Sequence, residues 1–340
     1  MTTFLEIIGV LALAVVLVIG GIYLYFRIKL GKYANVDQSK DQTPLIIHLN
    51  EEIEPEWVEK KEARAIEKSL TTLGFSADKC YEVVEMDGMQ LRAFFNAPYS
   101  AVLYTHPIAG LWVDMVANTT DGLDYTVSNA PMGGEIEHAP YEKKYWLKGE
   151  DVTTLFETLK KEVGEAPIEV IASETFRDSF EDAYKKEMQW KSQKGGISFE
   201  EVEKMAHNDS PKYSDEEILE TFRETKRKEL MRWHDGAMEV YEKENPTPQN
   251  ECYDRFDDLF IVPSKSDAVG FIRYLEDIYY LTSEQAKKFE NKYQTEKNIE
   301  MPTLFKEINE SFSKDLRATK KADVSYPIDI EIYEMTKPKY

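Results

Sequence analysis

Residues 81–95, YEVVEMDGMQLRAFF, carry the clearest hairpin signal in the chain. Two runs rich in apolar and β-branched residues flank Asp87-Gly88, and an Asp-Gly pair favours the positive φ angles of a two-residue type I′ turn. Such a turn joins two neighbouring antiparallel strands. This segment therefore predicts an antiparallel sheet in the first half of the chain.

Further apolar runs extend this predicted sheet. They cover residues 45–49, 100–106, 111–118 and 123–129. A four-residue loop at 107–110 would place two apolar groups on opposite faces of the sheet. The first group is Val102, Tyr104, His106, Leu111, Val113, Met115 and Ala117, and the second is Trp112, Val116, Tyr125 and Val127. Because both faces are apolar, we expect a sheet that is covered on two sides.

Two helices are expected beside these strands. Residues 56–73 and 151–163 have apolar side chains near a spacing of 3.6 residues, and Gly74 ends the first helix. Together with five central strands they predict an antiparallel α+β module over residues 45–165, which is a usual domain size.

Residues 166–340 are predicted to be mainly helical and to pack on this module. Ser173 caps a helix with an apolar residue every four positions, a stripe typical of a core-facing side. The stripe is Phe176, Phe180, Tyr184 and Met188. Capping boxes that begin at Ser198 and Ser214 start two more helices. We expect this half to cover the second face of the sheet and to form one cooperative unit with it.

The end of the chain has a strand pattern. Apolar residues alternate with other residues over 324–332, which predicts a terminal strand, and Pro327 would confine that strand to the edge of a sheet. The whole chain is therefore predicted to be α+β, with an antiparallel sheet module followed by a mainly helical extension.

An apolar segment precedes the module. Residues 7–26 form a run of twenty residues without a charge, long enough as a helix to span about 30 Å of hydrocarbon. Basic residues follow it at Arg27, Lys29 and Lys32, whereas the other flank carries Glu6. This bias predicts a single-pass signal-anchor with the N-terminus outside and the body in the cytoplasm.

Three ranges describe how the chain would meet the membrane. Residues 1–32 form the predicted anchor and its basic flank, residues 33–44 form a polar tether, and the acidic body begins at residue 45. The membrane is thus an expected partner through residues 7–26.

Composition excludes several classes of protein. The chain has 340 residues and a formal net charge of -21, and so large an acidic excess argues against a nucleic-acid partner. Cys80 and Cys252 are too few for a disulfide scaffold and suit a reducing compartment.

Catalytic motifs are absent from the sequence. It has no Walker A loop, no Gly-x-Gly-x-x-Gly, no Gly-x-Ser-x-Gly, no His-Glu-x-x-His and no Cys-x-x-Cys. One weak enzymatic constellation remains near the hairpin at residues 100–118, where His106 and Asp114 offer a base and a carboxylate beside Trp112. A histidine at the rim of a core is the more common interpretation of such a residue, because no nucleophile accompanies it.

No metal site or cofactor is predicted. His207, His234 and Cys252 are separated by 27 and 18 residues, and a zinc site needs closely set pairs of ligands. The glycine loop at 131–134 is followed by acidic residues instead of a helix, so a phosphate cradle is excluded there.

Three functional hypotheses remain. The first is a non-catalytic, membrane-anchored binding or scaffold protein whose cytoplasmic body takes a protein partner or a small ligand. The second is an enzyme with a site near His106, Trp112 and Asp114. The third reverses the topology and makes the chain a structural protein that faces the cell envelope.

Overall fold

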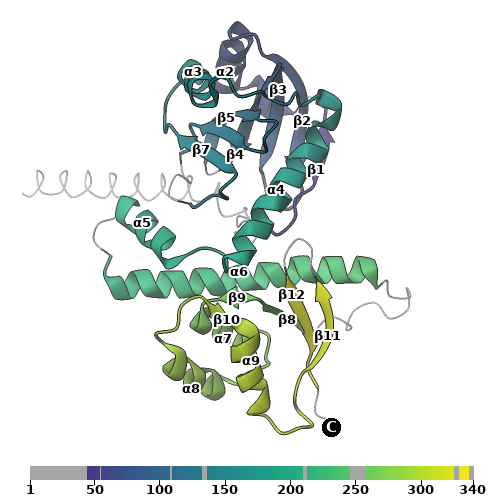
Figure 1. Ribbon diagram of the computed structural model, residues 1–340, viewed down its shortest axis with the longest axis vertical. Helices are drawn as coiled ribbons and strands as arrows, with labels where there is room; N and C mark the ends of the chain where they lie inside the picture. The colour runs from purple at the N-terminus through teal and green to yellow at the C-terminus, as the bar shows by residue number, and fades with distance from the viewer. Residues whose placement is uncertain are drawn as a thin grey trace, which may run out of the picture.

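The computed structural model describes residues 44–53, 55–107, 109–131, 136–209, 213–245, 258–324 and 329–336. The fold is α+β, with a large antiparallel sheet, flanking helices and a helical extension. These parts form two lobes, and the long helix α6 (Asp215–Glu244) lies between them (Figure 1).

The N-terminal lobe is built on a seven-stranded sheet whose spatial order follows the chain. Each strand is antiparallel to its neighbour except β7, which runs parallel to β6. The strands are β1 (Leu49–Glu52), β2 (Ser76–Val83), β3 (Gln90–Asn96), β4 (Tyr99–His106), β5 (Gly110–Asn118), β6 (Asp124–Ser128) and β7 (Glu142–Trp146). The strand predicted at 45–49 is displaced, because the chain pairs as β1 only from Leu49, and β7 at the other edge was not predicted.

The hairpin predicted at residues 81–95 is present, but its turn is wider than two residues. Glu82 pairs with Gln90, and the Val83 amide donates to the Met89 carbonyl at 2.9 Å. The backbone of Val84 instead donates to the His48 carbonyl at 3.0 Å. Two successive turns connect the strands, with the Met86 amide donating to the Val83 carbonyl at 3.1 Å and the Met89 amide donating to the Met86 carbonyl at 3.0 Å, so the pairing of β2 with β3 ends before the Asp-Gly pair.

The register of β4 and β5 differs from the prediction by one residue. Gly110 belongs to β5 and pairs with His106, so the connecting loop is shorter than the predicted four residues. A shift of one residue exchanges the two faces of a strand. Leu103, Val113 and Met115 therefore share one face, whereas Tyr104 and Trp112 lie on the other.

The predicted faces of β6 were also wrong. Tyr125 pairs with Ala117 and Val127 pairs with Met115, so both side chains pack with the same core as Val113. Trp112 and Val116 remain on the opposite face as predicted.

Helices cover both faces of the sheet. A 3-10 helix at Glu56–Glu59, α2 (Lys61–Thr72) and α3 (Val152–Val163) pack on one face, where Leu70 and Leu155 are fully buried. Helix α4 (Phe176–Gln193) lies across the other face and buries Phe176 against it (Figure 1). The predicted flanking helices are thus present.

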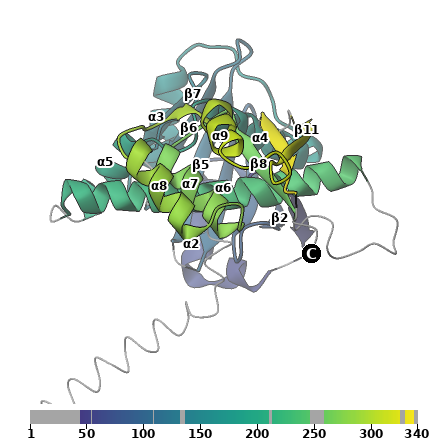
Figure 2. The same cartoon turned by 90° about the horizontal axis from the view of Figure 1, so that it is seen from below.

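The C-terminal lobe has its own core beneath α6. Seen from below, its helices lie in front of α6 with β8 and β11 beside them (Figure 2). Its elements are α7 (Ala268–Asp277), α8 (Ser283–Tyr293), α9 (Met301–Glu310), β8 (Leu259–Pro263), β11 (Thr319–Val324), β12 (Ile330–Glu334) and the short pair β9 (Lys265–Ser266) and β10 (Ile299–Glu300). Helix α5 (Phe199–Asp209) packs on α6 through Val202, Ile218 and Phe222.

Both predicted capping boxes are present. The Ser214 hydroxyl accepts the Glu217 amide while the Glu217 carboxylate accepts the Ser214 amide at the start of α6. The same reciprocal bonds join Ser198 and Glu201 before α5.

The terminal strand differs from the prediction. The chain forms two strands, β11 and β12, and β12 is the central strand of a three-stranded sheet in the order β11-β12-β8. The predicted edge position is therefore wrong for β12, because Ile330 and Ile332 are buried in the C-terminal core. Pro327 lies outside the described residues.

The predicted membrane span at residues 7–26 also lies outside the described residues. In the part of the chain that the structure describes, no helix combines the length and the apolarity that crossing a bilayer requires.

Candidate functional site

A cavity of about 370 Å³ lies between the sheet and α4. Its volume falls within the range of pockets that hold small organic ligands. Six aromatic side chains line it: Tyr104, Trp112, Trp146, Phe176, Phe180 and Tyr184. Phe180 and Tyr184 belong to the stripe that the sequence assigned to a core, but in the structure they are only half-buried and face this cavity.

The strand order gives the cavity an apolar end and a polar end. At the end formed by β1 to β3 the lining is Ile47, Val83, Met86 and Met89. At the end formed by β5 to β7 the register places polar residues opposite one another: Asp114 with Ser128, Thr126 with Lys144, and Asp124 with Glu142. The cavity therefore matches a ligand with an apolar body and a polar head.

Asp114 is the most unusual polar residue of this lining. It comes from the central strand β5, and its Oδ1 atom is buried without a hydrogen-bond partner among the described residues. Burial raises the pKa of Asp114, and Lys144, Ser128 and Tyr104 offset only part of that effect. The ionised form of a carboxyl group held in this way is stabilised by any ligand group that donates a hydrogen bond or carries a positive charge.

Aromatic rings surround this carboxyl group. Trp112 stacks on Tyr104, with ring centroids 4.9 Å apart and an interplanar angle of 9°. Burial, followed by the charge of Asp114, raises the pKa of Tyr104 well above its usual range, so its hydroxyl stays protonated. The stack presents flat apolar surface beside Asp114.

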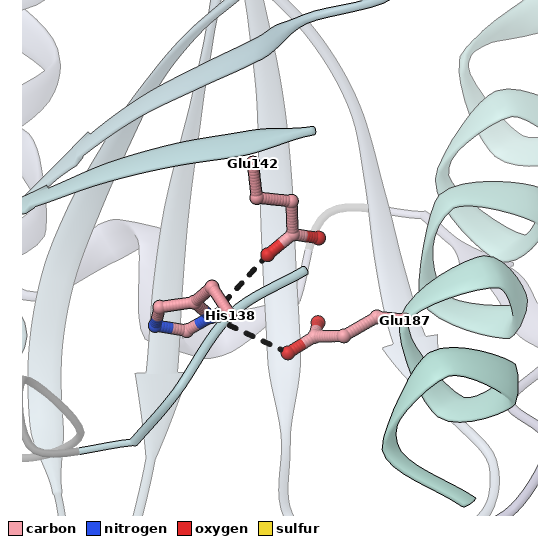
Figure 3. Close-up of side chains that lie close together, drawn as sticks. All are labelled: His138, Glu142 and Glu187. Carbon is pink, nitrogen blue, oxygen red and sulfur yellow. Dashed lines mark ion pairs between the residues drawn. The ribbon is translucent and has the colours of Figure 1, made fainter. Parts of the chain in front are cut away.

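A second group of polar side chains lies at the polar end. His138 precedes β7, Glu142 is the first residue of β7, and Glu187 comes from α4 (Figure 3). The His138 Nδ1 atom is 3.3 Å from Glu142 Oε2 and 3.6 Å from Glu187 Oε1. Lys191, one turn further along α4, places its Nζ atom 2.7 Å from Glu187 Oε1.

These groups alter one another's ionisation. Burial disfavours the charged imidazole of His138, but Glu142 and Glu187 outweigh it and raise the pKa of His138. Burial likewise opposes ionisation of Glu187, yet His138 and the positive charges of Lys191 and Lys144 lower the pKa of Glu187. The three side chains therefore act as one electrostatic unit.

The structure brings together two of the three residues predicted for an enzymatic site. Trp112 and Asp114 both line the cavity. His106 ends β4 outside the lining, and its Nδ1 atom accepts the Ala109 amide at 3.3 Å. The observed register puts His106 on the same face as Asp114, but His106 pairs with Gly110 at the end of β4 whereas Asp114 pairs with Val102, so His106 lies beyond the cavity.

Two of the three residues considered for a metal site are described. His207 is exposed on α5, His234 lies on α6, and Cys252 is outside the described residues. Over the described ranges, the one group of three His, Cys or acidic side chains close enough to share an ion is His138, Glu142 and Glu187.

Sequence reasoning missed this group and most of the cavity. A signal was present in β7, where Glu142, Lys144 and Trp146 alternate with other residues and point to one face. The charged residues of β7 obscured this signal, because strands are recognised in a sequence by the alternation of apolar residues.

Comparisons with protein-family profiles, curated proteins and solved structures gave no match. Fold and cavity define the class of protein: an α+β protein with a ligand-sized cavity between an antiparallel sheet and a covering helix.

Proposed function

We propose that this chain is a non-catalytic binding protein that takes a small amphipathic amine into the cavity between the sheet and α4. The observation that carries the proposal is Asp114, a residue of the cavity lining whose Oδ1 atom is buried without a hydrogen-bond partner among the described residues. A bound ammonium group supplies the opposite charge that favours the ionised carboxylate in a buried position.

The charge of the lining supports a cationic head group. Four carboxylates and one lysine line the cavity: Asp114, Asp124, Glu142, Glu187 and Lys144. Aromatic faces attract cations as well, and the Trp112 and Tyr104 stack lies beside Asp114. An amine head with an alkyl or aryl body therefore matches both ends of the cavity.

A series of n-alkylamines tests the proposal. Titration of the purified chain, followed by tryptophan fluorescence, should give saturable binding because Trp112 and Trp146 line the cavity. Each added methylene should lower Kd about fourfold, since burying one is worth ~0.8 kcal/mol, until the cavity is full. Alkyl carboxylates of equal length should bind more weakly. Equal binding of amines and carboxylates would contradict the proposal.

Asp114→Asn separates binding from folding. The variant should lose the preference for amines, whereas Asp178→Asn, which changes an exposed carboxylate elsewhere on α4, should keep it. Because the pKa of Asp114 is raised in the folded state, the contribution of Asp114 to stability is fully present below the unfolded pKa and is lost as pH rises through the folded pKa. Asp114→Asn should therefore gain stability relative to wild type between pH 4 and pH 7, and denaturant unfolding at both pH values measures this change.

We also propose that residues 1–32 anchor this binding body at the inner face of a membrane. The support is the uncharged run at 7–26 and the basic residues that follow it. Cys80 is a poor reporter of topology because it is buried, and burial raises its pKa to about 11.

An introduced cysteine tests the orientation. Lys161 keeps 81% of its side chain exposed, so Lys161→Cys in a Cys252→Ser background should react with a membrane-impermeant maleimide only after the cells are permeabilised. The Cys252→Ser chain alone is the control. Labelling of intact cells would reverse the topology and favour an envelope-facing protein.

A further inference from the structure

We propose that His138, Glu142 and Glu187 form a site for a divalent transition-metal ion, of which Zn²⁺ is the best match. The three side chains come from the segment before β7, from the start of β7 and from the middle of α4, and they point toward one another (Figure 3). The proposal does not depend on the amine ligand, because it concerns only these three residues and an ion.

The spacing of the donor atoms matches metal ligands better than direct hydrogen bonds. Charge-assisted hydrogen bonds place nitrogen and oxygen about 2.7–2.9 Å apart. The His138 Nδ1 atom is instead 3.3 Å from Glu142 Oε2 and 3.6 Å from Glu187 Oε1. Two ligands on a tetrahedral zinc ion, each ~2.1 Å from the metal, lie roughly 3.4 Å from each other.

Within the described part of the chain, His138 and Glu142 contribute buried atoms that make no hydrogen bond. Among the described residues, neither ring nitrogen of His138 has a hydrogen-bond partner, and neither has the Glu142 Oε2 atom. All three atoms are buried, and the side chains of His138, Glu142 and Glu187 each keep 16% of their surface exposed. Buried polar groups ordinarily make hydrogen bonds, whereas His138 Nδ1 and Glu142 Oε2 have only ion-pair contacts of 3.3 Å and 3.6 Å among the described residues, which supports a bound ion at this place.

Neighbouring side chains would orient the ligands. Lys191 Nζ lies 2.7 Å from Glu187 Oε1, the same oxygen that is 3.6 Å from His138 Nδ1, so Lys191 fixes the direction of this ligand. The His138 ring lies parallel to Trp146, with centroids 6.3 Å apart and an interplanar angle of 10°. Such contacts fix the direction of metal ligands.

The donor set also indicates the class of metal. One imidazole with two carboxylates suits a borderline ion, whereas Mg²⁺ and Ca²⁺ prefer oxygen ligands alone. Three protein ligands leave a tetrahedral ion one open position. Because Glu142 and Glu187 also line the cavity, the ion would stand at its polar end.

Metal titration of the full chain tests the proposal. The protein is stripped with a chelator, and Zn²⁺ alone is added in competition with a fluorescent zinc indicator. We expect one tight equivalent for wild type, with Mn²⁺ weaker and Mg²⁺ ineffective. His138→Ala and Glu187→Gln should each weaken Zn²⁺ binding at least ~100-fold. His207→Ala, which removes an exposed histidine, should change it less than twofold.

A spectroscopic measurement covers the case in which a variant fails to fold. Co²⁺ added to the stripped wild-type chain should give the visible absorption bands of a four-coordinate ion, and Zn²⁺ should abolish them. Wild-type protein without such bands, or folded Glu187→Gln with wild-type Zn²⁺ affinity, would overturn the proposal.

Discussion

Replacing Lys226 with methionine is expected to lower the free energy of unfolding by about 3–5 kcal/mol, the usual effect of breaking a buried ion pair. Lys226 lies on α6 and keeps only 2% of its side chain exposed. Its Nζ atom donates to the Gly195 carbonyl and lies 2.9 Å from Glu229 Oε2. Methionine has a similar length, so the loss reflects the unpaired groups and not a large cavity.

The contacts of Lys226 explain the large loss of stability expected when it is replaced. Gly195 and Gly196 form the turn that follows α4, and Glu229 packs against this turn so closely that a Cβ atom on Gly196 would lie 2.0 Å from its Oε2 atom. Glu229 also accepts the Ile197 amide at 3.2 Å. The pair of Lys226 and Glu229 therefore fastens the end of α4 to the helix that lies between the lobes.

A double-mutant cycle measured by chemical denaturation checks this prediction. Lys226→Met with Glu229→Gln should be more stable than Lys226→Met alone, because the double variant leaves no buried charge unpaired. Lys228→Met is the matched control, since Lys228 is half exposed and lies 3.6 Å from Glu224 Oε1, and it should change stability by less than ~0.5 kcal/mol. Similar losses of unfolding free energy for Lys226→Met and Lys228→Met would contradict the prediction, because the buried pair would then stabilise the fold no more than the exposed one.

Local sequence signals predicted the elements of this fold well. The capping box at Ser214, Gly74 and apolar periodicity act within a few residues, so α2, α3, α4 and α6 were expected close to where they lie. The predicted cap at Ser173 is wrong, because α4 begins at Phe176 after Thr175 and the Ser173 hydroxyl donates to Asp78. The hairpin at 81–95 was expected from its local pattern, although its turn is wider than predicted.

Strand register could not be predicted with the same certainty. Gly110 was assigned to a loop because glycine favours turns, but in the structure it pairs with His106. Including Gly110 in β5 shifts the pairing by one residue, and this exchanges the faces of β4 relative to those of β5. The prediction therefore separated Asp114 from Tyr104, which the structure places on one face of the sheet around the cavity.

The candidate site depends on long-range contacts that no local pattern contains. His138 and Glu187 are 49 positions apart by number, and they meet only because α4 crosses the sheet next to β7. Two strands without a strong apolar pattern, β1 and β7, were the ones that the sequence missed or displaced. A search for motifs could not join these residues, because their spacing along the chain carries no chemical meaning.

Phe176→Ala is the second substitution expected to have a large effect, with a loss of about 3–5 kcal/mol in the free energy of unfolding. The ring is 4% exposed and lies 5.7 Å from Tyr81 and 5.9 Å from Phe95, measured between centroids. The cavity lies under α4, so few other side chains of this helix pack on the sheet. Phe176 therefore attaches the first turn of α4 to the sheet.

The position of Phe176 distinguishes it from Phe180 one turn later. Phe180 is only half-buried and lines the cavity, so Phe180→Ala should lower the free energy of unfolding by less, about 1–2 kcal/mol, and enlarge the cavity.

Hydrogen exchange should show faster exchange across α4 in Phe176→Ala, with little change in α7 to α9, because these helices pack in a separate core. The amine series should shift toward longer chains in Phe180→Ala and weaken for every chain length in Phe176→Ala. Equal stability losses for the two variants, with exchange unchanged in α4, would mean that α4 is held mainly by its other end, through Lys226.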